Sequence, residues 1–172
     1  DLGSAVIFFA GYLIMVFIAT KNYFYLFAGI LGGAGASIVA YHMFSHVRTR
    51  VIAFLHPWSN INDSGYQITQ SLFAIGTGGW FGLGIDQGDP TSIPYVEQDF
   101  IFSAVAEEMG VIFGLCLILV CVSCFIVFMK IAMQLKEEFY RYIAVGLSTI
   151  YIFQVFLTIG GGTRFIPLTG VT

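Results

Sequence analysis

The chain has 172 residues, of which 58% are hydrophobic and only 10% are charged, and its formal net charge is −3. Soluble domains carry about 25% charged residues, so this composition excludes a soluble globular protein and indicates an integral membrane protein. The seven basic residues are spread along the chain and form no clustered positive footprint, which argues against nucleic-acid binding.

Four segments are long and apolar enough to cross a bilayer, which requires about 20 residues at 1.5 Å per residue. They are residues 4–20, 23–44, 100–129 and 140–159, and Asp1 is a candidate N-terminal cap for the first. The second contains small residues that predict close packing against another helix, namely Gly32, Gly33, Gly35 and Ala36. The sequence therefore predicts an all-α, polytopic transmembrane helical bundle.

A long connection of different character, residues 45–99, separates the second and third segments and contains both tryptophans and three of the four prolines. Within it, residues 67–84 are apolar enough to suggest a fifth span. Glycines concentrate at the end of this stretch, however, and each weakens a helix by about 1 kcal/mol. We therefore expect a short amphipathic or re-entrant helix that ends at the glycines.

The basic residues predict the orientation of the chain. The two short connections between segments carry four of them: Lys21, Lys130, Lys136 and Arg141. Residues 45–99 carry only Arg48 and Arg50, and Arg164 follows the last segment. Because short cytoplasmic loops are enriched in Lys and Arg, we expect residues 45–99 to form an extracellular loop.

Carboxylates gather where the third apolar segment begins: Glu97, Asp99, Glu107 and Glu108. On a helix beginning near Asp99, that residue, Ser103 and Glu107 would share nearly one face. A helix of about 30 residues would measure about 45 Å against a hydrocarbon core of about 30 Å, so its first turns can line a wet cavity. Asp99 alone fits a helix cap, whereas the two glutamates lie deeper and are candidates for function.

Several motifs of the chain point to one family when they are taken in order. They are "DLGSA" at the start, "GYQITQSLFAIGTGGWFGLG" at 65–84, "DFIFSAVAEEMG" at 99–110 and "IPLTGVT" at the end. Their order and spacing resemble the SEDS family (shape, elongation, division and sporulation proteins), which includes RodA, FtsW and SpoVE. The chain departs from the family pattern at Glu97 and Gln98, in place of His-Thr, and at Ser103, in place of Ala.

The resemblance implies a peptidoglycan glycosyltransferase that polymerises lipid II, a disaccharide linked to undecaprenyl pyrophosphate, at the outer face of the bacterial cytoplasmic membrane. Elongation, division and sporulation are all open as its cellular role. Family members have ten spans, so we expect this chain to be an excerpt that holds the sixth to ninth, with 45–99 as the fourth extracellular loop. A class B penicillin-binding protein is implied as the transpeptidase partner.

The family's essential loop aspartate corresponds to Asp99, which we expect to be the general base for the 4-hydroxyl of the acceptor sugar. Arg48 and Arg50 are expected to bind the pyrophosphate, or alternatively to anchor a helix end at the outer interface. The predicted substrate-binding set is completed by Gln67, Glu107 and Glu108. A divalent cation, Mg²⁺ or Mn²⁺, is a candidate to bridge the pyrophosphate and a carboxylate.

Two other functions fit the same residues. A lipid or small-molecule transporter or flippase would line its pathway with Glu107 and Glu108, and these deep acids would then matter more than Asp99. A non-catalytic scaffold of a cell-wall synthase complex would tolerate the substitution Asp99→Asn.

Overall fold

The computed structural model describes residues 2–61 and 65–170, and over these residues it contains helices and turns but no strand. The helices are α1 (Leu2–Thr20), α2 (Tyr23–Met43), α3 (Ser45–Leu55), η1 (Pro57–Asn60), α4 (Tyr66–Gly78), η2 (Pro90–Ser92), α5 (Ile101–Gln134) and α6 (Glu138–Gly162). The all-α prediction is confirmed. Asp1, the proposed cap, lies outside the described residues.

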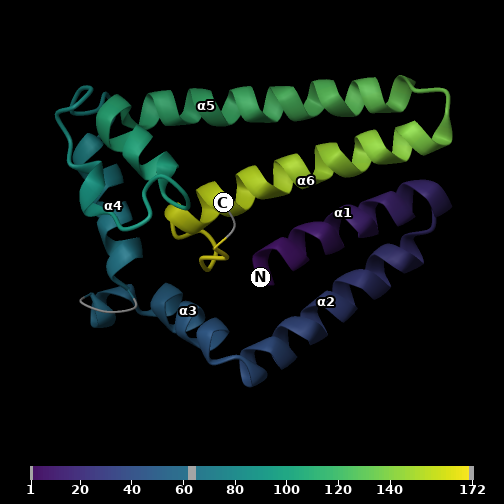
Figure 1. The fold of residues 1–172 in the computed structure, drawn as a ribbon, viewed down its shortest axis with the longest axis horizontal. Helices are drawn as coiled ribbons and strands as arrows, with labels where there is room; N and C mark the ends of the chain where they lie inside the picture. The colour runs from purple at the N-terminus through teal and green to yellow at the C-terminus, as the bar shows by residue number, and fades with distance from the viewer. Residues whose placement is uncertain (1, 62–64, 171–172) are drawn as a thin grey trace.

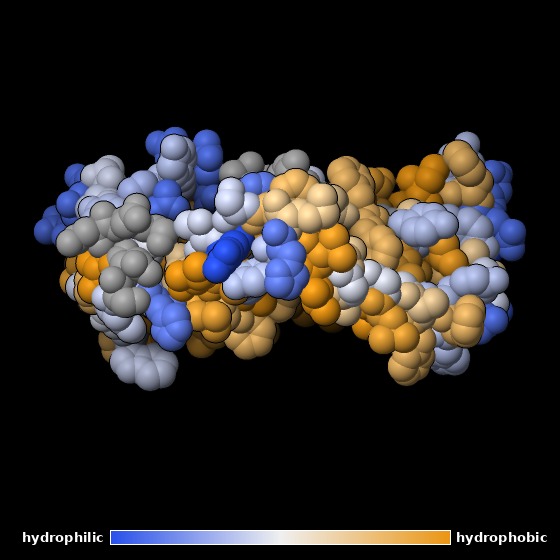
Figure 2. All heavy atoms as spheres, turned by 90° about the horizontal axis from the view of Figure 1, so that it is seen from below, coloured by the Kyte–Doolittle hydropathy of each residue, from blue (hydrophilic) through white to orange (hydrophobic). Residues whose placement is uncertain are grey.

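Four of the described helices, α1, α2, α5 and α6, are long and apolar enough to cross a membrane. α6 packs against both α5 and α1, and α2 slants away from α1 (Figure 1). Both short connections lie at one end of the molecule, while α3 and α4 lie at the other (Figure 1). Figure 2 shows hydrophobic residues spread over much of one face, hydrophilic residues at both ends and a small hydrophilic group near the middle. The chain is therefore a polytopic membrane protein.

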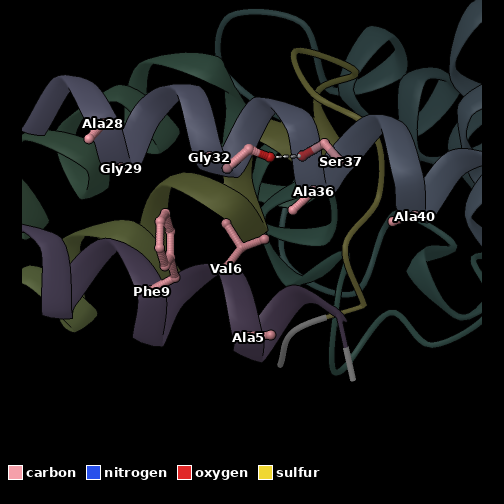
Figure 3. A pocket seen from close by; sticks show the side chains of 10 residues that line it. Ala5, Val6, Phe9, Ala28, Gly29, Gly32, Ala36, Ser37 and Ala40 are labelled. Carbon is pink, nitrogen blue, oxygen red and sulfur yellow. Dashed lines mark hydrogen bonds between the residues drawn. The ribbon is translucent and has the colours of Figure 1, made fainter.

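The small residues of α2 contribute unequally to its packing. Gly29 lies so close to Leu13 of α1 that a Cβ atom would overlap that side chain, and a Cβ at Gly33 would lie 3.3 Å from Phe9. Around Gly32 and Gly35, no described atom lies within 4 Å of such a Cβ, so the predicted close packing does not occur there. Instead, a cavity of about 400 Å³ opens beside Gly32, with Val6 and Phe9 of α1 also in its lining (Figure 3).

α5 is broken at Gly110, which has φ 86° and ψ 165°. Residues 101–109 form a short first segment that turns away from the long remainder of the helix (Figure 1). Asp99 precedes this segment, so the expected continuous face of Asp99, Ser103 and Glu107 on one long helix is wrong. Residues 111–134 alone measure about 36 Å, which is enough to cross the hydrocarbon core.

The glycine-rich loop after α4 explains the break. Four backbone hydrogen bonds join it to α5: Val111 N to Gly79 O (2.9 Å), Ile112 N to Trp80 O (3.3 Å), Leu83 N to Glu107 O (2.9 Å) and Gly84 N to Glu108 O (3.0 Å). The loop thus satisfies the donors and acceptors that the interrupted helix leaves free. Only glycine fits at Gly110, because a Cβ there would overlap the Trp80 carbonyl and the Gly82 amide.

Candidate active site

A cavity of about 170 Å³ lies where α3, the start of α4 and Asp99, just before α5, meet the C-terminal segment. We call it the Asp99 cavity. Its lining comprises Thr49, Arg50, Ala53, Gln67, Ile68, Asp99, Leu168 and Gly170. Three of the six residues predicted for the site, separated by up to 49 positions (99 − 50), therefore share one cavity. The arrangement places an acid, a guanidinium group and an amide around a small polar space.

Asp99 is presented by a turn and not by a helix. The N-cap of α5 is Phe100 and makes no side-chain cap hydrogen bond, so Asp99 is not the cap that its position suggested. The carbonyl of Tyr95, a residue held at φ 60°, accepts hydrogen bonds from the amides of Gln98 and Asp99. A non-glycine residue at positive φ costs about 1–3 kcal/mol, and such strain concentrates at functional sites.

The environment of Asp99 acts on its carboxyl group in two opposing ways. Partial burial raises the pKa of Asp99 above its usual value, because removal from water disfavours the charged form. The positive charge of Arg50 lowers the pKa, and this second influence is the smaller one. A carboxylate with a raised pKa is a better proton acceptor once it is ionised, which suits a general base.

Arg50 reaches the Asp99 cavity from α3 and is held by the C-terminal segment. Its Nη1 atom donates a hydrogen bond of 2.7 Å to the carbonyl of Thr169. Gly170 follows at φ 67°, and a Cβ there would lie 2.8 Å from the guanidinium Nη2. The contact with Thr169 uses one edge of the guanidinium group, whose five N–H donors leave others free for a ligand.

Arg164 fixes the end of α3, a role that the sequence did not reveal. Its Nε donates to the carbonyl of Phe54 (3.0 Å) and its Nη2 to that of Leu55 (3.3 Å). These are carbonyl groups of the last turn of α3, which carry the negative end of the helix dipole. Arg164 therefore steadies the helix that carries Arg50, although 110 positions separate it from Phe54.

The whole chain, residues 1–172, matches the sequence model of the FtsW/RodA/SpoVE family, described as "Cell cycle protein". The chain belongs to this family. Peptidoglycan glycosyltransferase RodA of Mycobacterium tuberculosis is 39% identical over 173 residues, covering 100% of this chain and 37% of the relative. Probable peptidoglycan glycosyltransferase FtsW of Aliivibrio salmonicida is 34% identical (100% and 44%), and stage V sporulation protein E of Bacillus subtilis is 31% identical (100% and 48%).

The resemblance inferred from the motifs is thus confirmed at the level of the family. The chain spans less than half of the length of each of these three relatives. The match therefore covers all of this chain but only a part of each relative.

In this family member, Glu107 and Glu108 lie outside the lining of the Asp99 cavity. The Oε1 atom of Glu107 accepts the Asp89 amide at 3.4 Å, and that of Glu108 accepts the Asp86 amide at 3.3 Å. Glu107 is buried, and its Oε2 atom has no hydrogen-bond partner among the described residues. Both side chains hold the backbone of the loop that leads towards Asp99, so the geometry favours a supporting role.

Ser103, one of the departures from the family pattern, lies in a buried junction of three helices. The Oγ atoms of Ser103 and Ser71 of α4 are 2.5 Å apart, and Ser71 Oγ donates to the carbonyl of Gly162 in α6 at 2.7 Å. The junction links α4, α5 and α6 beside the Asp99 cavity. A serine in an apolar run is visible in the sequence, but its distant partner is not.

The remaining predicted site residues, Gln67 and Arg48, lie in different places relative to the Asp99 cavity. Gln67 lines the Asp99 cavity, whereas Arg48 is exposed and outside its lining, so a phosphate-binding role for Arg48 stays a prediction. Within the described residues, no three His, Cys, Asp or Glu side chains are grouped to hold a metal ion. A cation that bridges one carboxylate and the pyrophosphate needs fewer protein ligands, so the expected Mg²⁺ or Mn²⁺ stays a prediction, and we assign no step to a metal.

Proposed function

We propose that this family member forms the catalytic region of a peptidoglycan glycosyltransferase that polymerises lipid II at the outer face of the bacterial cytoplasmic membrane. The observation that carries the proposal is the meeting of Asp99 and Arg50 in one small cavity. Relatives named as peptidoglycan glycosyltransferases support it, as does the basic character of the two short connections, which favours an extracellular position for the site.

The proposed reaction is a direct displacement at the anomeric carbon of the donor sugar. Asp99 accepts the proton of the acceptor 4-hydroxyl while the oxygen of that hydroxyl forms a bond with the anomeric carbon. The bond from that carbon to the pyrophosphate oxygen breaks, and undecaprenyl pyrophosphate leaves with its negative charge. Arg50 stabilises this charge through N–H donors that match phosphate oxygens, and Gln67 offers an amide to the sugar or phosphate.

An apolar groove beside the Asp99 cavity suits the lipid part of such a substrate. The groove has a volume of about 560 Å³ and shares Arg50 and Leu168 with the cavity. Its other lining residues include the apolar side chains of Val6, Phe153 and Leu157. A pyrophosphate bound at Arg50 would therefore lie between a polar space for the sugar and an apolar space for the polyprenyl chain.

The proposal is tested by lipid II polymerisation with the full-length protein. Asp99→Asn removes the proton acceptor at nearly constant shape, and we expect polymer formation to fall by about 10²–10⁴-fold. Glu97→Gln is the matched control, because Glu97 is an exposed carboxylate two positions away that does not line the cavity. We expect this control to keep near-normal activity.

Near-normal polymerisation by folded Asp99→Asn protein would contradict the proposal. It would then favour a scaffold, or a transporter if lipid flux continued without polymer. The class B penicillin-binding protein implied by the family resemblance is our proposed partner, and co-purification with the full-length protein is its direct test.

A further inference from the structure

The loop that follows α4 exposes four large apolar side chains. In residues 79–85, which we call the apolar loop, Phe81 is 85% exposed and Ile85 is 74% exposed, and Trp80 and Leu83 are exposed as well. Isolated exposed apolar side chains are common on proteins, but four within six positions indicate an interaction site.

The apolar loop is held in a defined position. Its backbone makes the four hydrogen bonds to residues 107–112 described above, so its side chains project from a fixed frame. This frame lies at the start of the long segment of α5, which is a candidate membrane span. The apolar loop is therefore located at one end of a membrane-crossing helix, where lipid and water meet.

The exposed surface of α5 continues the patch in the direction of the membrane. Ile112, the last residue of the hydrogen-bonded stretch, is exposed, as are Phe113 and Leu115 directly after it. On the other side of the apolar loop, the exposed polar residues Asp86, Gln87 and Asp89 follow at once in the sequence. The patch thus has an apolar neighbour towards the hydrocarbon core and a polar neighbour towards water, as expected at a bilayer interface.

We propose that the apolar loop inserts into the outer-leaflet interface of the phospholipid bilayer, with Trp80 and Phe81 among the headgroups and upper acyl chains. Tryptophan is enriched at this depth because its ring is apolar and its N–H group prefers a wet environment. α4 begins at the Asp99 cavity with Gln67 and ends at the apolar loop. Insertion therefore sets the depth of α4 and, with it, the height of the cavity above the membrane.

Fluorescence quenching of Trp80 tests this position without reference to catalysis. The full-length protein, with every tryptophan except Trp80 replaced by phenylalanine, is placed in phosphatidylcholine and phosphatidylglycerol nanodiscs. Interfacial insertion predicts that phosphatidylcholine with a shallow doxyl group lowers the emission at least about twofold, while aqueous iodide has little effect. Quenching by iodide alone would place the loop in water, and resistance to both quenchers would place it under protein. Either result overturns the proposal.

Thr91→Trp as the single tryptophan is the matched control, because Thr91 is exposed in the polar turn η2 of the same connection. We expect iodide, and not the lipid quencher, to reduce its emission. Equal lipid quenching at positions 80 and 91 would contradict a specific role of the apolar loop. If the tryptophan replacements prevent folding, a nitroxide on Phe81→Cys gives the same answer, with greater accessibility to oxygen than to a water-soluble nickel complex.

Discussion

Burial and the charge of Arg50 have opposite effects on the pKa of Asp99, and their balance can be measured. Burial raises the pKa of Asp99, and the charge of Arg50 limits that rise. A general base works only when it is ionised, so activity is lost as the pH falls below the pKa of Asp99. The acid limb of the pH–rate profile therefore reports the environment of this one carboxyl group.

Arg50→Gln is expected to move the acid limb of kcat/KM for lipid II polymerisation to higher pH. The substitution removes the influence that lowers the pKa, so a higher pH is needed to ionise Asp99. It is also expected to raise KM, because a phosphate-binding donor is lost. Arg48→Gln, on the same helix but outside the cavity lining, serves as the comparison. An unchanged acid limb in Arg50→Gln would show that Arg50 does not act on the base.

At the scale of single residues, the sequence points to Asp99, Arg50 and Gln67 as members of the site, and the fold brings these three into one cavity, while their roles in the reaction stay predictions. For Arg164, the sequence indicates only a charge after the last apolar segment, because nothing in its local sequence shows that it binds carbonyl groups of α3. Such a contact depends on tertiary packing, which local patterns do not record.

At the scale of helices and loops, the break in α5 shapes the end of the molecule that carries the Asp99 cavity. At the break, backbone groups of the apolar loop form hydrogen bonds with backbone groups of α5. The break also directs residues 101–109 towards α4. The sequence predicts a continuous helix here because an apolar run with only two glycines, Gly110 and Gly114, favours helix throughout. The competing hydrogen bonds come from a loop that lies more than twenty positions earlier in the chain, and helical periodicity does not reveal them.

Gly110→Ala is expected to destabilise the protein by roughly 2–5 kcal/mol, because a Cβ at φ 86° is strained and displaces hydrogen-bonded backbone. Thermal unfolding of the full-length protein in detergent measures this as a lowered Tm. Gly76→Ala in α4 is the control, since no described atom lies within 4 Å of a Cβ there and alanine favours helix. An equal Tm for the two variants would contradict the account of the break.

At the scale of the whole molecule, the long connection and the C-terminal segment come together at one end, opposite the two short connections (Figure 1). The number of long apolar helices and their approximate limits followed from composition, since about 20 apolar residues have few other stable arrangements. The contact of Arg50 with Thr169, 119 positions apart, did not follow, because it requires that α3 and the end of the chain share one surface.

The orientation of the molecule in the membrane is tested by cysteine labelling in intact cells. In a cysteine-free version of the full-length protein, we expect Thr91→Cys to react with a membrane-impermeant maleimide added outside. Gln134→Cys, at the last residue of α5 and between Lys130 and Lys136, is expected to react only after the cells are opened. The reverse pattern would place the Asp99 cavity on the cytoplasmic side and contradict the proposed reaction.

The role of Asp99 as general base is tested most directly on purified Asp99→Asn protein, by measuring both lipid II binding and single-turnover polymerisation. A general base acts in the transition state and contributes little to ground-state binding. We therefore predict that Kd for lipid II stays within about threefold while the single-turnover rate falls by about 10²–10⁴-fold. A rate close to that of the unmodified protein, or a loss of binding that accounts for the whole loss of activity, would contradict the role of Asp99 as the base.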